Sequence, residues 1–266
     1  MTTLRPELSE AQARRLLVER TVLDEQARAA HERDPGSWGL RTWLGPLLVL
    51  AGVLVLGHLV ARYDGPGGVA LAVAVLIGGE LLVLAALLAF GRPVAARAGG
   101  WRAAFGLDRV RRHDWLPWLV GFCVIYACRT AVVFVAAVLS DGRALEESSN
   151  LPTGDLTLLG IVVLVLAAVV LAPVTEELMF RGLLLRSFMR RMPFWPAALL
   201  SSLLFALFHV HQVQTLLGAV TLALSVGVLG VGACFVVRIT GRLAPAMMIH
   251  ATYNALALVI ALATAA

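Results

Sequence analysis

The stretch LTLLGIVVLVLAAVVLAPVTEELMFR, residues 156–181, decides what kind of fold this chain can form. Residues 156–172 carry no charge, and a helix needs roughly 20 apolar residues to cross a bilayer. Glu176, Glu177 and Arg181 follow directly. A charged side chain near the bilayer centre costs roughly 3 kcal/mol on insertion scales. The stretch therefore predicts a membrane helix in which the three ionisable groups have a functional role.

The composition extends this prediction to the whole chain. Of the 266 residues, 59% are hydrophobic and 15% are charged, whereas soluble domains are about 25% charged. The net charge of +5 comes from arginines in short connections between apolar runs, where they set topology, so we expect no nucleic-acid partner. Backbone amides in lipid must be satisfied within their own segment. We therefore expect an all-α, polytopic membrane helix bundle.

Seven apolar runs follow one another along the chain. They lie at about 43–61, 69–90, 116–139, 156–175, 196–209, 214–237 and 244–265. Arginines in the successive connections number 7, 1, 6, 1, 4, 0 and 2. Because cytoplasmic loops carry the excess of basic residues, this alternation predicts a cytoplasmic N-terminus, seven crossings of the cell membrane and an external C-terminus. Residues 176–191 could alternatively form an eighth helix, re-entrant or interfacial.

The polar residues 1–36 form a segment of their own. Ser9 is a candidate N-cap for a helix over about 10–32, and Asp34, Pro35 and Gly36 end it. We expect a cytoplasmic amphipathic surface helix; the alternative is an arm that binds the membrane surface or a partner. Residues 37–266 are predicted to form one membrane-embedded helical domain.

Two further charges lie inside predicted spans. Glu80 is about ten residues from the cytoplasmic end of the second span and Arg129 about fourteen from that of the third, a depth difference of about 6 Å at 1.5 Å per residue. Because unpaired intramembrane charges are rare, we expect Glu80 and Arg129 to form a buried structural pair.

The fourth run continues past Pro173 without a further helix breaker until Pro193. A helix over 156–191 would be about 50 Å long, more than a bilayer core, so the acidic pair would lie within the membrane. Glu176 precedes Pro193 by 17 residues and His209 follows it by 16. In an antiparallel hairpin turning at 193–196, Glu176 and His209 come level.

Several of the polar side chains share a helix face. Glu177 and Arg181 are four residues apart, and this spacing predicts an ion pair. His250 and Asn254 have the same spacing, and so do Phe205 and His209, which puts an aromatic ring beside an imidazole. A buried carboxylate and an imidazole can together hold and deprotonate a water molecule. Asn and His can donate hydrogen bonds to a developing oxyanion, so the set predicts peptide hydrolysis without a nucleophilic Ser or Cys.

Three motifs in order carry a resemblance to a known family. Glu176-Glu177-x-x-x-Arg181, Phe205-x-x-x-His209 and His250-x-x-x-Asn254 resemble the CPBP family of CAAX-protease and bacteriocin-processing intramembrane endopeptidases, also called Abi proteins. The resemblance covers about 115–260 and implies an all-helical membrane protease of the glutamate type. It implies that Glu176, assisted by His209, activates water, that His250 and Asn254 stabilise the tetrahedral intermediate, and that Glu177 and Arg181 support the site.

The cofactor and the function class each keep an alternative. Older descriptions call the family a metalloprotease, and two histidines with a glutamate could bind zinc, but no HExxH is present and we expect no metal. The expected substrate is a membrane-associated peptide or protein within the lipid bilayer. The first alternative is a non-catalytic scaffold or bacteriocin-immunity protein that keeps the protease fold, and the second is a transporter. His211 is either a group supporting the site or an external loop residue, and His58 is expected at a membrane interface.

Overall fold

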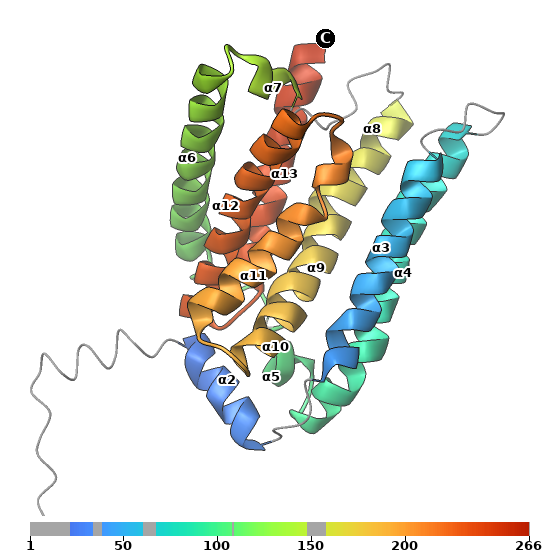
Figure 1. Ribbon diagram of the computed structural model, residues 1–266. Helices are drawn as coiled ribbons and strands as arrows, with labels where there is room; N and C mark the ends of the chain where they lie inside the picture. The colour runs from blue at the N-terminus through green and yellow to red at the C-terminus, as the bar shows by residue number, and fades with distance from the viewer. Residues whose placement is uncertain (1–21, 34–38, 61–67, 108, 148–157, 266) are drawn as a thin grey trace, which may run out of the picture.

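The computed structural model describes residues 22–33, 39–60, 68–107, 109–147 and 158–265, and its elements there are helical (Figure 1). Before the site region these are α2 (Val22–Arg33), α3 (Leu40–Val60), α4 (Gly68–Arg97), α5 (Trp101–Phe105), α6 (Trp115–Leu139) and α7 (Arg143–Glu147). The fourth apolar run comprises α8 (Leu158–Val165), η1 (Leu166–Leu171), α9 (Ala172–Glu177), η2 (Leu178–Leu184) and α10 (Leu185–Met189). The rest are α11 (Phe194–Leu207), η3 (Val210–Gln212), α12 (Leu216–Thr240) and α13 (Ala244–Ala265).

Within the described ranges, seven helical runs are long and apolar enough to cross a membrane. This confirms the predicted all-α polytopic bundle, and the chain is a multi-pass membrane protein. Residues 176–189 continue the fourth run, Leu158–Met189, so they do not form a separate eighth helix. The second run extends to Arg97, beyond the predicted end at residue 90, because α4 continues through Pro93.

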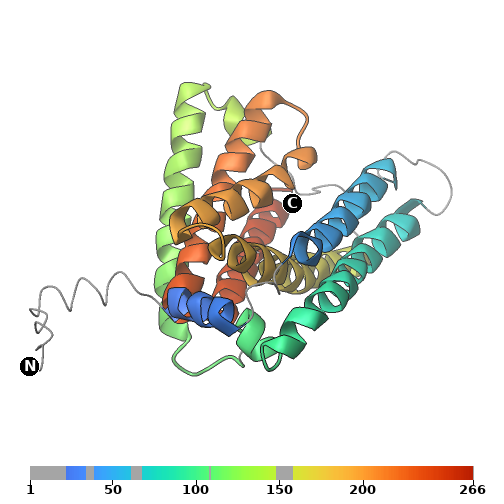
Figure 2. The same ribbon diagram turned by 60° about the horizontal axis from the view of Figure 1, so that its bottom comes forward.

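The bundle has a central helix and two flanks (Figures 1 and 2). More than half of the apolar window of α12 is buried, 56%, and α12 packs against α11, α6 and α13. The α3–α4 hairpin lies on the opposite side of the fourth run from α6 (Figure 1). The fourth run therefore lies between the hairpin and the rest of the bundle, and it carries the acidic pair into the interior.

The fourth run is not a regular α-helix. Two π-helical segments, η1 and η2, bound the short α9, which carries Glu176 and Glu177. In η1 the amide of Ala172 bonds the carbonyl of Ala167, five residues back, and in η2 the amide of Leu185 does the same with Phe180. Such wide turns inside helices are frequent at functional sites.

The described part of the N-terminal segment is helix α2, which packs against the ends of α12 and α10. Leu23 is fully buried, and Asp24 forms an ion pair with Arg238 at 3.1 Å. Gly241, at φ 68°, closes α12, and a Cβ there would clash with Val22 Cγ1. The predicted helix is therefore confirmed from residue 22, whereas Ser9 and the rest of 1–21 lie outside the described residues.

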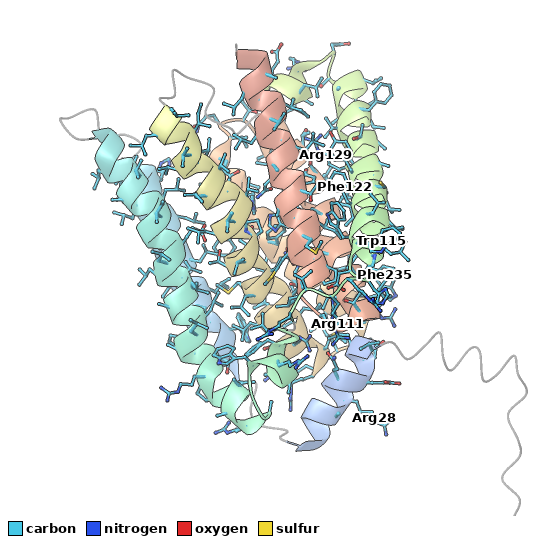
Figure 3. The ribbon with its side chains drawn as sticks, turned by 180° about the vertical axis from the view of Figure 1, so that it is seen from behind. Arg28, Arg111, Trp115, Phe122, Arg129 and Phe235 are labelled. Carbon is cyan, nitrogen blue, oxygen red and sulfur yellow. The ribbon has the colours of Figure 1, made fainter. Side chains whose placement is uncertain are left out.

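The predicted pair of Glu80 and Arg129 is wrong. Arg129 Nε donates to Ser225 Oγ and to Tyr253 Oη, both at 3.1 Å, whereas Glu80 accepts a hydrogen bond from Thr175. Arg129 projects from α6 beside α13, and α4 lies across the bundle (Figures 1 and 3). The prediction rested on depth along each span, and depth does not say which side of the bundle a span occupies.

Candidate active site

Three consecutive residues of α9 point in three directions, because successive side chains of a helix are about 100° apart. Thr175 faces α4, where its hydroxyl meets Glu80. Glu176 faces α11 and a cavity, and Glu177 faces inward, where its side chain is fully buried. Less than one turn of helix thus supplies contacts to three parts of the bundle.

The carboxylate of Glu176 lies between two imidazoles. Its Oε2 is 3.8 Å from His209 Nε2 and 3.6 Å from His250 Nε2. His209 Nδ1 lies 2.8 Å from the carbonyl of Phe205, and a carbonyl only accepts, so Nδ1 carries the hydrogen of the neutral ring. His209 then presents the lone pair of Nε2 towards Glu176. A carboxylate oxygen and an imidazole lone pair at this separation can share one bridging water.

Glu177 is held by a cation and an imidazole. Arg181 NH1 donates to Glu177 Oε1 at 2.9 Å, which confirms the predicted pair, and both side chains are fully buried. His250 Nδ1 also lies 2.9 Å from Glu177 Oε1. A fully buried carboxylate needs this compensation, because an unpaired charge in a low-dielectric interior is strongly destabilising.

The ring of Phe205 joins these groups. It is fully buried, its centroid lies 4.7 Å from that of His209, as the spacing predicted, and 5.7 Å from that of His250. The guanidinium carbon of Arg181 lies 4.3 Å from the same centroid. Phe205 therefore fixes both imidazoles and the buried cation at once.

Asn254 is positioned by a backbone hydrogen bond that Pro173 cannot make. In the π-helical register of η1, the amide of residue 173 would bond the carbonyl of Ala168, and proline has no N–H. Asn254 Nδ2 donates to that carbonyl at 2.8 Å. The second hydrogen of Nδ2 remains for a ligand in the cavity, whose wall includes Asn254.

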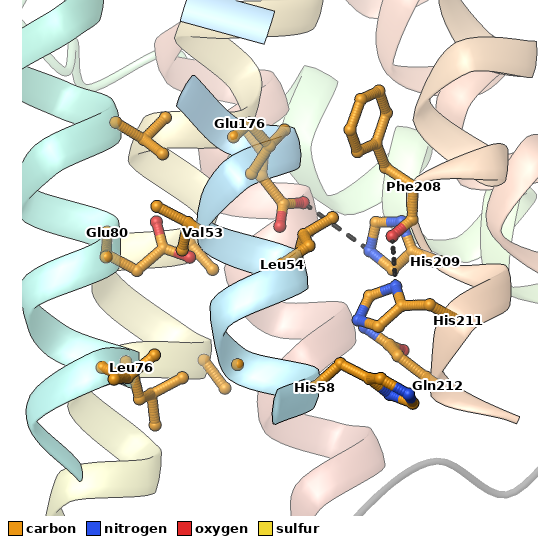
Figure 4. Close-up of a pocket in the computed structure, with 18 of the residues that line it drawn as sticks. Val53, Leu54, His58, Leu76, Glu80, Glu176, Phe208, His209, His211 and Gln212 are labelled. Atoms are coloured by element: carbon orange, nitrogen blue, oxygen red, sulfur yellow. Dashed lines mark hydrogen bonds and ion pairs between the residues drawn. The ribbon is translucent and has the colours of Figure 1, made fainter. Parts of the chain in front are cut away.

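A cavity of about 660 Å³ lies between the α3–α4 hairpin and the site (Figure 4). Its wall is mostly apolar, and its polar lining residues are His58, Glu80, Glu176, His209, His211, Gln212, Gln214 and Asn254. His250 does not line it and is only 2% exposed. Of the predicted catalytic set, Glu176, His209 and Asn254 therefore face the cavity, and His250 lies behind Glu176.

Two wall residues were not among the predicted site residues. His211 Nδ1 lies 2.8 Å from the carbonyl of Phe208, and its ring and that of His58 lie on the cavity (Figure 4). Thr175 was also missed, although a threonine next to an acidic pair was a visible signal. Glu80 was singled out for its charge but was assigned the wrong partner.

In the described part of the chain, no three His, Cys, Asp or Glu side chains are grouped so that they could hold a metal ion. The described residues therefore do not fit a metal ion, and metal-free catalysis stays a prediction.

Comparison with known proteins finds a family that resembles part of this chain. Residues 158–256 match the family described as type II CAAX prenyl endopeptidase Rce1-like. Over these residues, named here the Rce1-like region, the chain is similar to that family. The match confirms the resemblance that the three motifs predicted, and the Rce1-like region contains the whole of the catalytic set and its supporting residues.

A curated relative covers a smaller part of both chains. A 24.3 kDa protein of Escherichia coli, described as uncharacterized, is 34% identical over 123 residues, which make up 44% of this chain and 52% of the relative. The chain thus spans about half the length of that relative. No solved structure matches.

Proposed function

We propose that the protein is an intramembrane endopeptidase that hydrolyses a peptide bond of a membrane-associated substrate. The observation that carries the proposal is the pair of distances from Glu176 Oε2 to the two imidazoles, inside a region of a CAAX prenyl endopeptidase family. A carboxylate, an imidazole lone pair and a nearby amide donor are what water-mediated peptide hydrolysis needs.

In the proposed reaction, Glu176 and His209 hold the attacking water. Glu176 removes one of its protons as the oxygen adds to the substrate's carbonyl carbon. The same proton then passes to the leaving nitrogen as the C–N bond breaks. The N–H of His209 stays on the Phe205 carbonyl, which keeps the lone pair of Nε2 directed at the water.

We assign the developing oxyanion to the free hydrogen of Asn254 Nδ2, because Asn254 is on the cavity wall. The family resemblance gives His250 a share in this role. Its burial and its position between two carboxylates instead support a positioning role, in which its ring orients Glu176 and Glu177.

The cavity suggests how a substrate enters. Its wall is formed largely by apolar side chains of α3, α4 and the fourth run, such as Leu50, Val53, Leu76 and Leu164. We infer an apolar or lipid-anchored segment that approaches through the bilayer beside the α3–α4 hairpin. The lipid bilayer is then part of the substrate's path.

A cleavage assay in nanodiscs tests the proposal. Purified protein is incubated with a fluorogenic peptide library, with and without chelator, alongside His209→Ala and the matched control His113→Ala, which changes an exposed histidine. We expect cleavage by the wild type and the control, a loss of roughly 10²-fold or more in His209→Ala, and no effect of chelator.

Two outcomes would change the assignment. Failure of the wild type to cleave any library peptide favours the non-catalytic scaffold or immunity protein. Loss of cleavage on chelation, with recovery on adding zinc, overturns the metal-free reaction.

A further inference from the structure

Glu80 is a third carboxylate of the candidate site, and it comes from outside the Rce1-like region. It projects from α4 and lines the same cavity as Glu176 (Figure 4). Among the residues that the structure describes, no basic side chain pairs with Glu80. Burying a carboxylate without a cation is costly, so the presence of Glu80 in the cavity wall needs an explanation.

The partner that Glu80 does have is one residue from the proposed base. Thr175 Oγ1 donates to Glu80 Oε2 at 2.5 Å. The carbonyls of Leu171 and Ala172 are each 3.1 Å from the same hydroxyl. A hydroxyl has a single hydrogen, and the charged acceptor is the closest and strongest of the three.

This hydrogen bond acts on a segment with little support from its own helix. α9 is bounded on both sides by π-helical turns, and Pro173 removes one amide from its first turn. Side-chain contacts therefore decide its rotation. Glu177 is anchored on one side by Arg181 and His250, and Thr175 is anchored on the other side by Glu80.

We propose that Glu80 is a positioning residue for the reaction: through its hydrogen bond with Thr175, it fixes the rotation of α9 and so aims Glu176 at His209. The inference rests on the proposed endopeptidase function for its kinetic part. It gives the α3–α4 hairpin a role in assembling the site as well as in lining the cavity.

The test uses substitutions that separate the hydrogen bond from the side chain's size and charge. Glu80→Met removes the acceptor at similar length, Glu80→Gln keeps an oxygen that accepts from Thr175, and Thr175→Val removes the donor. Glu146→Gln, at an exposed position on α7, is the matched control. Turnover is measured at each variant's own pH optimum, so that the removed charge does not enter the comparison.

We expect E80M and T175V to lower kcat about 10-fold or more with KM changed less than about 3-fold, and the double variant to be no worse than either single one. E80Q should recover activity to within about 3-fold of wild type. Hydrogen exchange of the amides at 174–178, measured without substrate, should be about 5-fold faster in E80M and T175V and unchanged in E80Q.

Three results overturn the inference. If E80M has the kcat and the amide exchange rates of the wild type, the hydrogen bond between Glu80 and Thr175 does not position α9. An E80Q variant as impaired as E80M would assign the effect to charge rather than to the hydrogen bond. A fall in melting temperature that accounts for the lost activity would show a merely structural contact. If the wild type cleaves nothing, the proposed function fails, whereas the exchange measurement still decides the positioning role.

Discussion

The buried guanidinium of Arg181 allows two adjacent glutamates to lie in an apolar interior. It is fully buried, bonds Glu177 and packs on Phe205. Removing one partner of a buried pair costs more than removing both, because the remaining charge is left uncompensated. At the residue scale, this predicts that the cost of losing Arg181 depends on whether Glu177 is charged.

Arg181→Met is expected to lower the free energy of unfolding by about 3–5 kcal/mol. Adding Glu177→Gln should restore a large part of this loss, because Gln still accepts from His250 and carries no charge. Reversible unfolding in mixed micelles measures both, with the exposed Arg109→Met as control. A double variant as unstable as Arg181→Met would contradict the account.

Asn254 has a separate effect on turnover. We expect Asn254→Ala to lower kcat by about 10²–10³-fold, the usual loss of one oxyanion donor. It should also destabilise the protein by about 1–3 kcal/mol, because the Ala168 carbonyl loses its partner. Steady-state kinetics measure the loss of kcat, and unfolding of the same variant measures the loss of stability. Unchanged kcat would remove Asn254 from the oxyanion role.

Residue spacing made part of this site predictable. Glu177 and Arg181 are four residues apart on one helix, so their pairing required no knowledge of the bundle. Counting residues from the turn at Pro193 brought Glu176 level with His209, and the distance between their side chains is 3.8 Å. The partner of Glu80 was not predictable, because it depends on which spans are neighbours.

At the scale of elements, the irregular fourth run gives the site its geometry. Its length was predictable from the absence of a helix breaker between Pro173 and Pro193. Its π-helical turns were not, because they depend on tertiary contacts such as the bond from Asn254 to the Ala168 carbonyl. Pro173 was the local signal, since it removes the amide that would have competed for that carbonyl.

Pro173→Ala tests this directly. An alanine amide can bond the carbonyl of Val169, four residues back, as a regular α-helix requires, so the run is expected to relax towards that register and to turn Glu176 away from His209. Stability should stay the same or rise, while kcat falls about 10-fold or more. Thermal unfolding and steady-state kinetics, measured on one preparation of the variant, give its stability and its kcat. A variant with wild-type activity would show that the irregular turns do not position Glu176.

At the scale of the whole molecule, the described helices form one bundle in which the α3–α4 hairpin covers the Rce1-like region from one side. The seven spans were predictable because each needs only length and apolar composition. The packing of α2 against α12 was not, because it depends on contacts such as Leu23 in the interior and Asp24 with Arg238.

The orientation in the membrane stays a prediction that a reporter can test. Alkaline phosphatase fused after the last span should be active, because a reporter attached to an external C-terminus folds outside the cytoplasm. Fusion in the arginine-rich connection after α4 should give an inactive reporter. The reverse pattern would place the N-terminus outside.

The central claim is that Glu176 deprotonates the attacking water. The most direct measurement is kcat/KM of Glu176→Gln in nanodiscs, compared with wild type and with the matched control Glu146→Gln. The account predicts a loss of about 10³-fold or more in Glu176→Gln, with folding and substrate binding retained and the control unaffected. Glu176→Gln activity within about 10-fold of wild type would contradict it.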